Sequence, residues 1–296
     1  MKTTRLFFLL FASLMMAACG SDDSNGGGEG GDANVNANQP TAKHPEVTRY
    51  EFPKLKGGSS VIVTHKTSGT YDASNINFST EWDNDKLSQR WTCYQMHKGF
   101  GGNSGRYSGN PLYPFDSDLA AAGGKYLDDD YFWSSGFDHG HICPSADRTF
   151  SVDANKQTFY LTNMQPQYNP FNAGIWAVLE DKIRKWTNAT GNEILYVCKG
   201  GTIDKEANIL KRIKGKLIVP KYFFCALLLK TKSGTYRAAG FWFLNESNDR
   251  STEPLADFMM SVDELEAKTG IDFFCNLPDD IENRVEKSVS VKAWGL

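Results

Sequence analysis

Short runs of apolar and β-branched residues dominate the hydrophobic pattern of this 296-residue chain. Runs of this length and composition are typical of β-strands, several of them buried on both faces. We expect strands at 59–65, 90–96, 158–164, 193–201, 216–230 and 235–245. The sequence KSGT at 232–235 lies between the last two runs, and its turn-forming residues predict an antiparallel hairpin.

Helical periodicity is clearest between residues 171 and 191. Apolar side chains recur there at three- and four-residue intervals, and they form one stripe along a helix. The stripe consists of Ile175, Trp176, Leu179, Ile183 and Trp186. Asn172 stands where an N-cap would lie, and Gly191 stands where the helix would end.

A second helix is predicted at 261–270. Ser261 and Glu264 have the spacing of a capping box, and Gly270 is a C-terminal stop. Because strands outnumber helices and the two are interspersed, we expect an α+β fold with a mostly antiparallel central sheet flanked by helices.

The first 18 residues have the pattern of a signal peptide. Lys2 and Arg5 precede a short apolar run, and small residues lie directly before Cys19. The run is too short to span a bilayer. A cysteine at this place resembles the bacterial lipoprotein cleavage box, which implies cleavage before Cys19 and a lipid on its sulfur. An ordinary secreted protein with an unrelated cysteine is the alternative.

Residues 19–42 are predicted to be the lipidated cysteine and a disordered tether. The segment is rich in Gly, Asn and Asp and has almost nothing to bury. The resemblance places the chain at the bacterial outer membrane, and acidic residues after Cys19 resemble signals for the outer cell surface. Residues 43–296 show no internal repeat and no second linker, so we expect a single domain there.

Charge and cysteine content narrow the function. The chain carries a net charge of −3, so it lacks the basic surface of a scaffold that grips nucleic acid tightly. A local site that touches a few phosphates is still compatible with this charge. The spacing of the cysteines after Cys19 does not match a zinc site. Because their number is odd, at least one thiol stays free or pairs between molecules. The cysteines in predicted strands are expected to be buried. The cysteines after Cys19 are Cys93, Cys143, Cys198, Cys225 and Cys275.

The stretch FDHGHICPSADRTF at 137–150 is the strongest candidate for chemistry. His139 and His141 are two residues apart, so on a strand they point to the same side. A zinc site needs three or four ligands, and His44, His65 and His97 stand in no recognisable motif, which disfavours a two-histidine zinc site. A catalytic base and simple packing are the alternatives.

Two further blocks follow this stretch in order. The three blocks are DHGHICP at 138–144, TNMQPQ at 162–167, and a helical block with Asn172, Trp176, Leu179, Glu180 and Arg184. Together they resemble the DNA/RNA non-specific endonucleases of the ββα-metal type, typified by secreted bacterial nucleases and mitochondrial endonuclease G. The resemblance implies a ββα-metal motif and a metal-dependent enzyme that hydrolyses DNA and RNA to 5′-phosphate products.

The resemblance also implies residue roles. His141 would be the general base, since an imidazole is suited to deprotonate water near neutral pH. Asn172 would bind one Mg²⁺ directly, with Mn²⁺ or Ca²⁺ as substitutes, and Glu180 would hold the ion through water. Arg184 would contact phosphate near the transition state, and Asn163 would position the site, unless it is only a turn residue at the end of a strand.

Two positions depart from the family pattern. The family has arginine where this chain has His139, and a histidine offers fewer donors and a charge that depends on pH. We therefore expect His139 to weaken phosphate binding at high pH or to add an acid limb to the activity profile. Arg106 lies near the place of an upstream phosphate-binding arginine, although the local match is loose.

Two other functions compete with the endonuclease. One is a surface lipoprotein that binds nucleic acid or another ligand on a retired nuclease scaffold, and the other is a metallo-hydrolase with a different substrate. The retained His141, Asn172, Glu180 and Arg184 argue against the first. The absence of a matching ligand pattern argues against the second.

Overall fold

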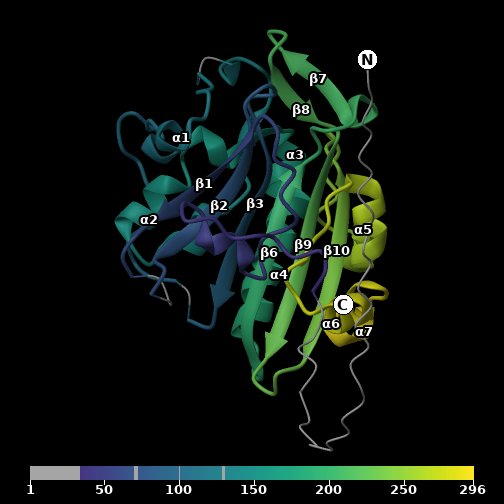
Figure 1. Ribbon diagram of the computed structural model, residues 1–296. Coiled ribbons are helices and arrows are strands. Elements are labelled where there is room, and N and C mark those ends of the chain that lie inside the picture. The colour runs from purple at the N-terminus through teal and green to yellow at the C-terminus, as the bar shows by residue number, and fades with distance from the viewer. Residues whose placement is uncertain (1–33, 70–72, 100, 129–130) are drawn as a thin grey trace, which may run out of the picture. The chain divides into compact units, whose positions relative to one another are not determined.

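The computed structural model describes residues 34–69, 73–99, 101–128 and 131–296 (Figure 1). Residues Asp32–Leu296 form one compact unit, here called the second unit of the chain, and it contains everything described below. The predicted signal peptide at 1–18, the lipidated Cys19 and the tether up to residue 33 lie outside the described residues. None of the described helices is both long enough and apolar enough to cross a membrane.

A seven-stranded sheet forms the centre of the second unit, and it confirms the predicted α+β class with a mostly antiparallel sheet. Every pair of neighbouring strands in it is antiparallel. Its strands, in spatial order, are β1 (Ser60–Lys66), β2 (Ile76–Asp83), β3 (Ser88–His97), β6 (Asn192–Gly201), β9 (Tyr222–Thr231), β10 (Tyr236–Leu244) and β11 (Met259–Met260). The predicted hairpin is present as β9 and β10.

Two small sheets accompany the central one. They pair β4 (Asp138–His141) with β5 (Met164–Gln167), and β7 (Ile209–Ile213) with β8 (Leu217–Pro220). The helices are α1 (Ser117–Ala122), α2 (Val152–Gln157), α3 (Asn169–Phe171), α4 (Ala177–Asn188), α5 (Val262–Thr269), α6 (Asp279–Glu286) and α7 (Val291–Trp294). Short 3₁₀ turns are η1 (Pro45–Thr48), η3 (Ser145–Arg148), η4 (Leu161–Asn163), η6 (Glu206–Asn208) and η7 (Leu255–Phe258), and η5 (Asn172–Trp176) is a π-type turn.

Both faces of the central strands are buried, because helices cover each face. Side chains alternate along β6 and β9, so that Val197 and Leu227 pack in one core with the apolar stripe of α4. Cys198 and Leu228 pack in the other core, against α5 and α6. Figure 1 shows α5 beside β10, at the opposite end of the sheet from β1. Continuous apolar strands are therefore explained by burial on two sides.

The prediction of a strand at 158–164 was wrong. Thr158 ends α2, residues 161–163 form η4, and strand pairing starts only at Met164. Phe159 and Leu161 bury their side chains in a third core without forming a strand. The run at 216–230 also divides into β8 and β9 at Pro220, which has no backbone N–H to continue a ladder.

The main helix begins earlier than predicted and is interrupted. It starts at Asn169, and Asn172 is not an N-cap, because its backbone N–H donates to the Tyr168 carbonyl at 2.9 Å. A π-type turn at Gly174 separates α3 from α4. A Cβ on Gly174 would lie 2.9 Å from Asp249 Oδ1, so glycine permits this close approach. Such turns inside helices often occur at functional sites.

Three other predictions can be compared with the described residues. The helix α5 has the predicted capping box, with Ser261 and Glu264 reciprocally bonded, and Gly270 ends it in a left-handed conformation. The five described cysteines are all free and buried. The end of the predicted tether, residues 34–42, lies against the domain instead of extending from it: buried Asn38 donates through Nδ2 to the Val47 carbonyl at 3.1 Å.

Candidate active site

The strand β4 places two histidines on one side of a short antiparallel pair. His139 lies opposite Pro166 of β5, and His141 lies opposite Met164. Gly140 separates them, and a Cβ there would lie 2.2 Å from Cδ of Gln167. Only glycine leaves room for that buried glutamine, so the local sequence H-G-H presents both rings to one face.

Both rings line a cavity of about 510 Å³. The cavity is bounded by the loop before β4, by β4 itself and by the start of the interrupted helix. Its polar and aromatic lining includes Arg106, Tyr113, Phe132, Trp133, Asp138, His139, His141 and Asn172. The predicted general base and the predicted metal ligand therefore share one opening, although 31 residues separate them in the sequence.

His141 is held as a neutral ring with one unused nitrogen. Its Nε2 is buried and has no hydrogen-bond partner among the described residues, so its bond to the backbone of His139 falls on Nδ1. Burial, followed by the charge of Arg106, lowers the pKa of His141 to about 3. Phe159 packs edge-on against the ring, with centroids 4.9 Å apart. These contacts fix the ring and leave Nε2 able to accept a proton.

Asn172 is oriented by the carboxylate of Asp138, the first residue of the DHGH block. Its Nδ2 donates to Asp138 Oδ2 at 2.9 Å, and Asn169 makes a second bond of 2.9 Å to the same oxygen. Because Nδ2 is used in this bond, the amide oxygen of Asn172 is the atom that can face a cation. Asp138 lines the same cavity and adds a second oxygen donor.

His139 lies between two aromatic rings. Its ring stacks on Tyr113 with centroids 4.0 Å apart and on Phe132 with centroids 4.2 Å apart, and Trp133 packs edge-on at 5.9 Å. Arg106 is exposed at the cavity, and its guanidinium lies 4.8 Å from the centre of the Phe159 ring. Arg106, the arginine predicted to bind phosphate, therefore lies at the cavity that contains His141.

Asn163 is buried below the site and does not line the cavity. Its Oδ1 accepts from Cys143 N at 2.8 Å, and its Nδ2 donates to the carbonyls of Cys143 and Thr158, each at 2.9 Å. It therefore ties the chain that follows His141 to the end of α2. Its role as a positioning residue stays a prediction, because Asn163 also ends the 3₁₀ turn that precedes β5.

Glu180 and Arg184 lie on α4 outside the cavity lining. Lys199, fully buried on β6, donates to Glu180 Oε1 at 2.8 Å and lies 4.3 Å above the Trp176 ring. Arg184 donates to Asp147 Oδ1 at 3.0 Å. Burial raises the pKa of the Glu180 carboxyl, and Lys199 opposes that rise. Both residues are engaged with other elements, so neither forms the simple surface pair that spacing alone allows.

Comparison with known proteins now decides the family. The family described as DNA/RNA non-specific endonuclease matches residues 57–280, which include every site residue described above. The chain belongs to this family. It is accordingly a hydrolytic endonuclease, and the family's nucleases depend on a metal ion.

Individual relatives agree with this assignment. The endonuclease is 30% identical over 241 residues to a nuclease of Nostoc sp., covering 79% of this chain and 84% of that nuclease. It is also 30% identical over 151 residues to mitochondrial endonuclease G of Bos taurus, covering 48% of this chain and 50% of that protein. The solved structure of an EndoG/EndoGI complex has a TM-score of 0.62 at 17% identity, covering 82% of this chain and 96% of that chain, which shows a shared fold.

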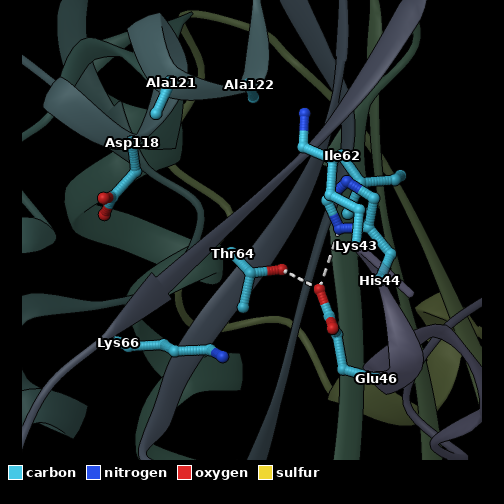
Figure 2. A pocket seen from close by; sticks show the side chains of 9 residues that line it. All are labelled: Lys43, His44, Glu46, Ile62, Thr64, Lys66, Asp118, Ala121 and Ala122. Atoms are coloured by element: carbon cyan, nitrogen blue, oxygen red, sulfur yellow. Dashed lines mark hydrogen bonds and ion pairs between the residues drawn. The ribbon is translucent and has the colours of Figure 1, made fainter. Parts of the chain in front are cut away.

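A second polar cavity of the endonuclease, of about 190 Å³, is separate from the one that holds His141. Figure 2 shows Glu46 there, with its carboxylate pointing toward Thr64 and His44, at 2.8 and 3.0 Å. Asp118 also lines this cavity, and buried His65 lies 2.9 Å from Asp118 and 3.6 Å from Asp116. These three residues are close enough to hold a metal ion, but the two carboxylates approach different ring nitrogens, and a single ion binds only one nitrogen of an imidazole.

Three residues around the endonuclease site were missed by sequence reasoning. Asp138 was visible as the first residue of the DHGH block. Asp147 lies in the same stretch but offers no motif of its own. Lys199 had one available signal, since a lysine within the apolar run of β6 must find a buried partner. That signal did not reveal that the partner is Glu180.

Proposed function

We propose that this endonuclease cleaves DNA and RNA without regard to sugar or sequence, that it uses Mg²⁺, and that His141 is the general base that yields 5′-phosphate products. The observation that carries this proposal is the unpartnered Nε2 of His141 in the same cavity as Asn172 and Asp138. A neutral nitrogen beside oxygen donors suits proton removal from water next to a phosphodiester.

The oxygen donors fit the metal that we propose. Mg²⁺ prefers oxygen ligands, keeps several waters and is often bound by only one or two protein groups. The amide oxygen of Asn172 and the carboxylate of Asp138 provide such a set. No thiolate lines the described part of the cavity, and its second imidazole, His139, is stacked between Tyr113 and Phe132. When bound, the ion would offset charge on the phosphate and the leaving oxygen.

The chain's own residues would bind and orient the substrate. Exposed Arg106 lies close enough to His141 to lower its pKa, so a phosphate held by Arg106 would also lie near Nε2. The anionic phosphate would offset the effect of Arg106 and raise the basicity of His141 when substrate is present. Contacts of this kind involve the backbone of the nucleic acid, which carries no sequence information.

We also propose that the chain is exported and anchored to the bacterial outer membrane through a lipid on Cys19. Support comes from the basic start, the short apolar run and the small residues before Cys19. Metabolic labelling with a palmitate analogue tests this proposal, because replacement of Cys19 by serine should remove the label.

The metal site is tested by digestion of plasmid and of RNA. With Mg²⁺ both substrates should be cut, and EDTA should stop cutting. Asn172→Ala should raise the Mg²⁺ concentration for half-maximal rate by about tenfold or more, because it removes a proposed ligand. Asn169→Ala is the matched control: it removes the other bond to Asp138 but no group that lines the cavity, so its Mg²⁺ dependence should stay near that of the native chain. Equal Mg²⁺ dependence in both variants would contradict the site.

His139 should determine the pH dependence of activity near neutral pH, either through weaker phosphate binding at high pH or through an acid limb. Since the pKa of His141 is about 3, His141 stays neutral from about pH 5 to about pH 9 and adds no acid limb there. A loss of kcat/KM toward one end of that range therefore belongs to another group, and His139→Arg should change both the profile and KM. An unchanged profile and KM in His139→Arg would contradict the role given to His139.

A further inference from the structure

Six carboxylates converge on a cavity of about 350 Å³ that shares no residue with the one around His141. The cavity lies between the N-terminal segment at 35–36, the helix α5 and the helix α6. Its acidic residues are Asp263, Glu266, Asp272, Asp279, Glu282 and Glu286. No lysine or arginine of the described chain lines it. So much uncompensated negative charge in one place is costly unless a cation offsets it.

Three of these carboxylates are close enough to share one ion. Asp263, Glu266 and Glu286 each offer one oxygen, and these oxygens all lie within 4.8 Å of one another. Oxygens bind Ca²⁺ at about 2.3–2.6 Å, so two ligands on opposite sides of the ion are about 4.6–5.2 Å apart. The three side chains therefore have the separation of ligands around a single ion.

An independent observation concerns oxygens that lack a donor. Glu286 is only 4% exposed, and its Oε1 is buried with no hydrogen-bond partner among the described residues. Asn36 lines the same cavity, and its Oδ1 is also buried with no hydrogen-bond partner among the described residues. Buried acceptors are almost always satisfied, so two unsatisfied oxygens on one cavity point to a missing partner.

The other polar groups nearby do not supply that partner. Glu266 accepts from Phe273 N at 2.7 Å, and Glu282 accepts from Asn36 Nδ2 at 2.9 Å. Lys54 is close, but its Nζ donates to the carbonyls of Asn36 and Ala37 at 2.5 and 3.0 Å. Burial, reinforced by neighbouring carboxylates, raises the pKa of Glu266 to about 8 and that of Glu286 to about 10. Without an ion, protons take the place that a cation would fill.

We propose that Asp263, Glu266 and Glu286, with the amide oxygen of Asn36, bind one Ca²⁺ that fastens the N-terminal segment to α5 and α6. Ca²⁺ accepts six to eight oxygens in flexible arrangements, whereas Mg²⁺ requires a small octahedron and keeps its water. A roomy cavity with several carboxylates and an amide suits the larger ion. This Ca²⁺ site is structural, because it is distinct from the cavity that contains His141. The proposal does not depend on the function proposed above.

Thermal unfolding of the full-length chain tests the site. After treatment with EDTA and its removal, millimolar CaCl₂ should raise Tm by about 3–8 °C, and MgCl₂ at the same concentration should raise it much less. Glu286→Gln should abolish the Ca²⁺-dependent rise. The same variant should equal or exceed the native Tm in EDTA, because it removes one of the repelling carboxylates. It should also retain Mg²⁺-dependent cleavage.

Two controls locate the effect. Asp280→Asn removes an exposed carboxylate of α6 outside the cavity, and its Ca²⁺-dependent rise should match that of the native chain. Calcium titration of Asn172→Ala by calorimetry should still show one binding event, which assigns binding to the acidic cavity and not to the proposed catalytic metal. The proposal would be overturned if Ca²⁺ did not change the Tm of the native chain, or if Ca²⁺ raised the Tm of Glu286→Gln as much as that of the native chain.

Discussion

Cleavage of plasmid by His141→Ala should fall by about 10²–10⁴-fold, the range expected when a general base is removed. The fold should remain, because the ring is half-buried and its Nε2 makes no hydrogen bond within the described chain. The measurement is the initial rate of plasmid and RNA digestion under saturating Mg²⁺, with far-ultraviolet circular dichroism as the check of folding.

The matched control for this variant is His44→Ala. His44 lies at the other polar cavity, paired to Glu46, and has no place in the proposed chemistry. Its rate should stay within about twofold of the native rate, since changes away from the site have small effects on structure. Cutting by His141→Ala at the native rate would contradict the role of His141 as general base. Loss of activity in both His141→Ala and His44→Ala would indicate damage to the fold.

The second large effect concerns stability. Lys199→Met should lower the free energy of unfolding by about 3–5 kcal/mol, because it removes one partner of a buried ion pair and leaves Glu180 uncompensated. Lys199 has no exposed surface, and its ammonium contacts both Glu180 and the Trp176 ring. Urea unfolding followed by tryptophan fluorescence measures the change.

Two further variants separate the pair from general packing. Lys185→Met breaks an exposed pair with Asp181 on the same helix, so its cost should be about 0–1 kcal/mol. Combining Lys199→Met with Glu180→Gln should recover much of the lost stability, because no charge is then left buried alone. If the double variant were as unstable as Lys199→Met, the loss would come from packing around Trp176 and not from the charge of Glu180.

The sequence predicted the strands of the central sheet that consist of apolar runs, but it did not predict β2 (Ile76–Asp83), whose buried side chains are mostly polar. An apolar run such as 193–201 has few alternatives to a central strand, and a capping box followed by glycine defined α5 with equal clarity. The pattern failed where polar side chains support an irregular backbone. Asn163 holds a 3₁₀ turn in a stretch that has the composition of a strand, and Asn38 fastens a segment that has the composition of a tether.

The site residues likewise divide into those that the sequence motif predicted and those whose contacts only the tertiary structure shows. The family motif identified His141 and Asn172, and the tertiary structure places both on one cavity. The motif did not predict that Arg184 forms an ion pair with Asp147, or that Glu180 forms one with Lys199. Those partners come from other elements, and pairing between elements is set by how the helix packs on the sheet.

By itself, then, the sequence determined the α+β class, the order of the three motif blocks and the side chains available for phosphodiester chemistry, because these depend on local periodicity and residue type. Only the tertiary structure decided the protonation state of His141, the orientation of Asn172 by Asp138, and the meeting of carboxylates from α5 and α6. Each of these depends on burial and on distances between segments far apart in the chain, and a one-dimensional pattern contains neither.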